Sequence, residues 1–201
     1  MGKEMNKLET MKAIDNFWTF FEVIADQLTK EPENLELISI LDDKVVQTLG
    51  LDWEIGPTDE GLYFCLSPKL DDELIDKVKL TISRAPSISN WDFIVGKPKK
   101  LELIEEFVIL DDDESEINIS TRGWRVIVYK YKDSTCDIDV LMDNALNKDL
   151  QYIALDIALT NMLGELNYMQ KIGKAAVVEE FDNETNKIGI EFIHLNNVLG
   201  W

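Results

Sequence analysis

The stretch EINISTRGWRVIVYKYKDSTCDIDVLM, residues 116–142, decides the fold class. Apolar and polar side chains alternate along it with a period of two, which predicts strands at 116–120, 124–131 and 136–142. Short polar segments join these strands. Because links this short connect antiparallel neighbours, we expect an antiparallel meander.

Helices are expected on both sides of this stretch, where apolar residues recur every three or four positions. The expected helices cover 8–29, 34–49, Ser67-Pro68 to Ala85, and about 148–170. Gly50 occupies the position of a left-handed C-terminal cap. Gly164 falls inside the last helix and predicts a kink or a close packing contact.

The remaining apolar segments are predicted to be strands. They cover 53–55, 62–67, 91–95, 101–110, 175–178 and 188–193, with hairpins from the first two and from the last two. Strands outnumber the helical crossovers that a parallel sheet requires. We therefore predict a single α+β domain over 1–201, in which about four helices pack on a mostly antiparallel sheet. A helical hairpin at about 8–49 precedes the mixed portion, 51–201.

Composition excludes several classes of function. The 201 residues include 20 Lys and Arg against 39 Asp and Glu, a net charge of −19, and 45% are hydrophobic. The apolar content argues against a disordered acidic tail, and the charge argues against binding to nucleic acid or to an anionic membrane surface. No apolar run approaches the roughly 18 residues of a membrane span, and no signal peptide is recognisable, so a cytoplasmic location is expected.

No catalytic motif is present, and no cofactor is expected. The chain lacks the glycine-rich phosphate-binding loops and the G-x-S-x-G motif of hydrolases. It has a single histidine, His194, and two cysteines, Cys65 and Cys136, which are expected to be buried thiols. This set excludes the usual zinc sites. His194 is either a surface histidine or the base of a nucleophile pair.

Carboxylates are the remaining candidates for metal ligands or catalytic groups. Asp137 and Asp139 lie two apart in a predicted strand and therefore share one face. They are candidate ligands for Ca²⁺ or Mg²⁺, and with Glu165 they are candidates for a metal-dependent hydrolase. The alternative is that they form the solvated face of a half-buried sheet.

The negative charge is concentrated in residues 101–150, which hold 13 acidic and 5 basic side chains. Its centre is the predicted turn Asp111-Asp112-Asp113-Glu114. An acidic surface of this kind attracts a basic protein and speeds their association, although it also serves solubility alone. Trp91, at a loop-to-strand junction, is a candidate anchor for the partner or a core residue.

The leading hypothesis is therefore a non-enzymatic acidic module that binds a basic protein, of the immunity or inhibitor type. The alternatives are the carboxylate- or metal-dependent enzyme and a structural or dimeric module. The stretch Ser83–Phe93 resembles a motif of small bacterial proteins, and that resemblance implies no activity. The oligomeric state is left open.

Overall fold

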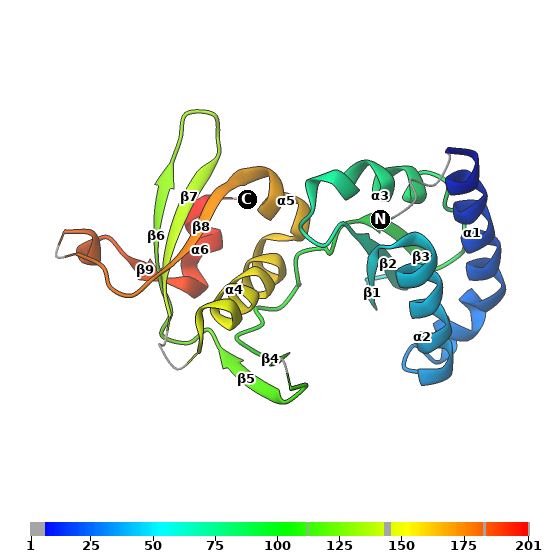
Figure 1. Ribbon diagram of the computed structural model, residues 1–201, viewed down its shortest axis with the longest axis horizontal. Helices are drawn as coiled ribbons and strands as arrows, with labels where there is room; N and C mark the ends of the chain where they lie inside the picture. Colours follow the sequence, from blue (N-terminus) through cyan, green and yellow to red (C-terminus); the bar gives the residue numbers. More distant parts are fainter. Residues whose placement is uncertain (1–6, 112, 143–145, 183, 201) are drawn as a thin grey trace. The chain divides into compact units, whose positions relative to one another are not determined.

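The computed structural model describes residues 7–111, 113–142, 146–182 and 184–200 (Figure 1). The chain divides into two compact units, residues 1–97 and 98–201. The single domain expected over 1–201 stays a prediction. In both units helices pack on small sheets, and four of the six strand pairings are antiparallel, which confirms the α+β class.

The sheet of the first unit has the order β1-β2-β3. Its strands are β1 (Asp52–Pro57), β2 (Leu62–Ser67) and β3 (Trp91–Val95). The antiparallel pairing of β1 with β2 confirms the predicted hairpin. Strand β3 runs parallel to β2, because the chain between them crosses over through the helical segment.

The helices of the first unit follow the predicted order with different boundaries. They are α1 (Lys7–Lys30), α2 (Leu35–Asp42), which continues as a π-helical segment (Asp43–Leu49), a 3₁₀ turn (Asp72–Leu74) and α3 (Ile75–Ile82). The predicted cap is confirmed, because Gly50 ends the π-helical segment with a φ of 63°.

The predicted helix start at Ser67-Pro68 is wrong. The Ser67 Oγ accepts a hydrogen bond from the backbone N–H of Lys69, which begins a turn instead of a helix. The cap lies four residues later, where Asp71 Oδ1 accepts from the backbone N–H of Glu73 at 2.8 Å.

An aromatic cluster forms the core of the first unit. Phe17, Trp18 and Phe21 on α1 all contact Phe64 on β2, and Trp18 and Phe21 also contact Phe93 on β3, with ring centroids 4.9–6.2 Å apart. Their spacing of three and four on α1 places all three rings on one helical face. The core of this unit therefore lies between α1 and the sheet.

The main sheet of the second unit has the order β8-β7-β6-β9. Its strands are β6 (Arg125–Lys130), β7 (Cys136–Leu141), β8 (Ile172–Val178) and β9 (Ile190–Glu191). Strand β7 is antiparallel to β6 and parallel to β8. The predicted terminal hairpin is wrong, because two strands separate β8 from β9.

The meander prediction is also only partly correct. Strand β5 (Glu116–Ser120) pairs with β4 (Glu106–Leu110) in a separate two-stranded sheet, so it does not join β6. Residues 101–105, predicted to continue the strand, have no regular secondary structure.

Helices cover the main sheet of the second unit on one face. They are α4 (Lys148–Leu163), α5 (Glu165–Lys171) and α6 (Leu195–Leu199), with 3₁₀ turns at Thr185–Lys187 and Phe192–His194. Val126, Ile138 and Val140 pack in one cluster with Ala154 and Leu155 of α4. Gly164, with a φ of 79°, separates α4 from α5, so the predicted kink is a break between two helices.

Both cysteines are buried free thiols, as predicted. Cys65 lies in β2 and Cys136 in β7. Burial raises the pKa of the Cys136 thiol above its usual value, with a smaller contribution from the neighbouring Asp137 carboxylate.

Candidate functional site

The β4–β5 hairpin has an inner face that packs on the core and an outer face in solvent. Phe107 pairs with Ile119, and Ile109 with Ile117, and all four belong to or contact the core of the second unit. Since side chains alternate along a strand, the next residues point the other way. The outer face consists of the pairs Glu106–Ser120, Val108–Asn118 and Leu110–Glu116.

The outer face combines apolar area with carboxylates. Val108 is 48% exposed and Leu110 is 58% exposed. Glu116 lies directly across from Leu110, and Glu106 lies two residues before Val108 on the same face. The two apolar side chains are therefore flanked by negative charge at both ends.

The turn that joins the two strands fixes where its carboxylates point. Asp111 Oδ1 accepts hydrogen bonds from the backbone N–H groups of Asp113 at 2.9 Å and Ser115 at 2.8 Å. Glu114 adopts a left-handed conformation with a φ of 60°. Asp111 thus holds the turn, and the exposed Asp113 and Glu114 side chains lie at its tip. Asp112 lies outside the described residues.

An arginine compensates part of the negative charge at the base of the hairpin. Arg122 Nε donates to Glu105 Oε2 at 3.0 Å, and its Nη2 lies 3.6 Å from Glu106 Oε1. The hydrogen bond to Glu105, with the charges of both carboxylates, raises the pKa of Arg122. None of the ion pairs seen among the described residues involves Asp113, Glu114 or Glu116, so uncompensated charge lies toward the tip.

We call the outer side chains of this hairpin and of its turn the hairpin surface. It consists of Glu106, Val108, Leu110, Asp113, Glu114, Glu116, Asn118 and Ser120. A hollow of about 420 Å³ lies at the open end of the hairpin, and residues of both faces line it: Glu106, Phe107, Val108, Asn118, Ile119 and Ser120. Among the described strands, none pairs with the outer edge of β4 or of β5.

Asp137 and Asp139 share one face of β7, as predicted, and they accept hydrogen bonds from Tyr131, which directly follows β6, and from Tyr129 of β6. Tyr131 Oη donates to Asp137 Oδ2 at 2.8 Å, and Tyr129 Oη donates to Asp139 Oδ2 at 2.9 Å. The hydrogen bond to Asp137 raises the pKa of Tyr131, and burial followed by the hydrogen bond to Asp139 raises that of Tyr129. The pairs form an exposed tyrosine–carboxylate ladder.

The metal hypothesis for this ladder gains no support from the geometry. Within the described ranges, no three His, Cys, Asp or Glu side chains come together in a group that could hold a metal ion. Glu165 is buried at the start of α5, and His194 is exposed with Nε2 3.6 Å from Glu191 Oε2. A metal at Asp137 and Asp139 stays a prediction.

Trp91 lies in the core of the first unit and is only 7% exposed. Its Nε1 donates to Thr29 Oγ1 at 2.9 Å, which satisfies the one polar group of the indole. A ring held in this way offers little area to a partner, so Trp91 is not part of the hairpin surface.

Sequence reasoning located the acidic turn and missed the apolar part of the surface. The run Phe107-Val108-Ile109-Leu110 is continuously apolar, so it carries no alternation that separates inner from outer residues. Only the register with β5 shows that Val108 and Leu110 point outward.

No protein-family model, curated protein or solved structure matches the chain. Within the described ranges, no helix has both the length and the apolar composition needed to cross a membrane. Function is therefore inferred from the chain's own side chains.

Proposed function

We propose that the chain is a non-enzymatic binding module whose hairpin surface engages a basic protein, in the manner of an acidic immunity or inhibitor protein. The supporting observation is the pairing of exposed apolar area, at Val108 and Leu110, with uncompensated carboxylates at Asp113, Glu114 and Glu116. An apolar centre with a charged rim is the usual anatomy of a protein interface.

The charge of the hairpin surface indicates which kind of surface the partner presents. It should present an apolar patch ringed by lysine or arginine side chains, because cations opposite the carboxylates give electrostatic complementarity. Such complementarity mainly raises the association rate and excludes acidic competitors, while the buried apolar residues supply most of the affinity.

A solubilising role for the acidic residues is the competing explanation, and it makes a different prediction. Charge that only keeps the protein dispersed acts through its total amount. Charge that binds a partner acts through its position. Variants that remove equal charge at two places therefore distinguish the two roles.

The experiment compares two triple variants on a column. One variant neutralises the hairpin surface with Asp113→Asn, Glu114→Gln and Glu116→Gln. The matched control changes Glu179, Glu180 and Glu184 to Gln, which are exposed carboxylates of the same unit. Immobilised wild-type, hairpin-variant and control proteins are each exposed to native lysate at low and at high salt.

We expect the wild type and the control to retain the same basic protein at low salt, and high salt to release it. The hairpin variant should lose at least roughly tenfold of the capture, which corresponds to about 1.4 kcal/mol. Equal capture by the two triple variants, or capture that salt does not affect, would show that the hairpin surface is not the binding site.

A further inference from the structure

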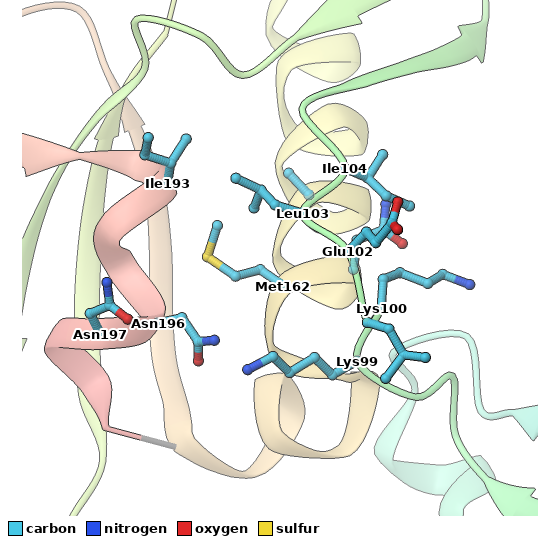
Figure 2. A pocket seen from close by; sticks show the side chains of 12 residues that line it. Lys99, Lys100, Glu102, Leu103, Ile104, Met162, Ile193, Asn196 and Asn197 are labelled. Atoms are coloured by element: carbon cyan, nitrogen blue, oxygen red, sulfur yellow. The ribbon is translucent and has the colours of Figure 1, made fainter. Parts of the chain in front are cut away.

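A second candidate site lies in the second unit, between the segment 98–104, α4 and α6 (Figure 2). It is a pocket of about 240 Å³. Its apolar wall includes Leu103, Met162 and Ile193, and its polar side chains include Lys99, Asn196 and Asn197. None of these residues belongs to the hairpin surface.

The polar end of the pocket has an exposed cation, Lys99, and a buried hydrogen-bond acceptor, Asn196 Oδ1, and none of the interactions found among the described residues pairs either of them. Asn196 Oδ1 is buried, and no donor of the described residues reaches it. Lys99 forms none of the ion pairs found among the described residues. Figure 2 shows the Lys99 side chain extending toward α6 and the Asn196 amide extending from α6 toward it.

The other charged residues of the lining do not neutralise Lys99 inside the pocket. Lys100 and Glu102 extend from the opposite side of the segment and point away from α6 (Figure 2). The backbone N–H of Lys100 donates to the carbonyl oxygen of Asn161 at 2.9 Å, which ties the segment to α4. The pocket wall is thus anchored to a helix, and Lys99 is its cation.

We propose that this pocket binds a small apolar carboxylic acid that also carries an N–H group, such as an N-acylated leucine or the carboxyl-terminal residue of a peptide. The carboxylate would pair with Lys99 Nζ, because an ammonium group is satisfied by an anionic acceptor. The N–H would donate to Asn196 Oδ1 after the amide turns this buried oxygen toward the pocket, since a buried acceptor without a donor costs free energy.

The apolar part of the ligand would lie against Leu103, Met162 and Ile193. Met162 suits this role because its side chain is flexible and polarisable and adapts to the shape of the group that it contacts. The volume of about 240 Å³ fits one side chain and its backbone rather than a nucleotide or a larger cofactor. The site goes beyond the proposed protein-binding function and does not depend on it.

The test titrates the full chain with small probes. Binding is monitored through the NMR signals of the pocket residues. The probes are N-acetyl-L-leucine, its amide, which lacks the carboxylate, and 4-methylpentanoate, which lacks the N–H. We expect N-acetyl-L-leucine to shift the signals of Met162, Ile193 and Asn196, and each of the other two probes to bind roughly tenfold more weakly.

Two variants assign these losses to residues. Lys99→Gln should weaken N-acetyl-L-leucine roughly tenfold and leave the amide unchanged. Its matched control, Lys100→Gln, removes the same charge from a side chain that points away, and it should change binding less than about twofold. Asn196→Leu should abolish the preference for N-acetyl-L-leucine over 4-methylpentanoate.

An acetylated tripeptide that ends in leucine distinguishes the two sources of the ligand. Tighter binding than N-acetyl-L-leucine supports a peptide terminus, and equal binding supports a small molecule. Three results would overturn the proposal: no shifts at the pocket with any probe, equal binding of acid and amide, or equal losses with Lys99→Gln and Lys100→Gln. The comparison of Lys99→Gln with Lys100→Gln tests the carboxylate site even if Asn196→Leu fails to fold.

Discussion

At the scale of single residues, a half-buried tyrosine–carboxylate pair joins α4 and α5. Tyr168 Oη of α5 donates to Asp156 Oδ1 of α4 at 2.5 Å, and both side chains are half-buried. Burial raises the pKa of Asp156, and the hydrogen bond from Tyr168 opposes part of that increase. Burial and the same hydrogen bond raise the pKa of Tyr168. The pair links the two helices that flank Gly164.

The raised pKa of Asp156 predicts a pH dependence of stability. Because the folded state binds the proton more tightly than the unfolded state, this group stabilises the fold at low pH. Its contribution is lost as the pH rises through the folded pKa. Asp156→Asn should flatten this part of the profile of unfolding free energy against pH, measured by urea denaturation. An unchanged profile would contradict the assignment.

Tyr168→Phe is the companion variant. It removes the donor and leaves a half-buried carboxylate without its partner, so the free energy of unfolding should fall by about 1 kcal/mol at neutral pH. The loss should shrink as the pH falls, because protonated Asp156 no longer needs the donor. An equal loss of unfolding free energy at neutral pH and at a pH low enough to protonate Asp156 would indicate only a packing defect.

At the scale of elements, the turns explain which sequence predictions succeeded. Gly50 and the turn at Asp111 were located correctly, because local side chain–backbone geometry determines both. The predicted hairpin at 175–178 and 188–193 failed, because strand partners depend on contacts between distant residues. Strands β8 and β9 each pair with a different strand of the β6–β7 hairpin. Local composition carries no information about that choice.

The hairpin turn itself can be tested. Asp111→Ala removes an oxygen that accepts two backbone hydrogen bonds, so the free energy of unfolding should fall by roughly 1 kcal/mol. Asp113→Ala, at an exposed position of the same turn, is the matched control and should stay within about 0.5 kcal/mol of the wild type. Urea denaturation of the three proteins measures both values. Equal losses would show that Asp111 does not hold the turn.

At the scale of the whole molecule, the net charge of −19 is distributed unevenly along the chain. The sequence predicted an acidic region within 101–150 and an acidic turn at its centre. The structure places exposed Val108 and Leu110 beside those carboxylates, which gives the region the composition of an interface.

The pocket at Lys99 and Asn196 was not foreseen, because its lining comes from segments about 60 and 95 residues apart in the chain. The only hint was a pair of lysines, Lys99-Lys100, in an acidic chain.

The hairpin surface is proposed to bind the basic partner. The most direct test is an NMR titration of the labelled chain with the basic protein that the column retains. We predict that the largest changes in amide chemical shift fall in β4, β5 and their turn, residues 106–120, and that the Asp113→Asn, Glu114→Gln, Glu116→Gln variant needs at least roughly tenfold more partner to show them. Shifts centred outside 106–120, and retained in the triple variant, would show that the basic protein binds elsewhere on the chain.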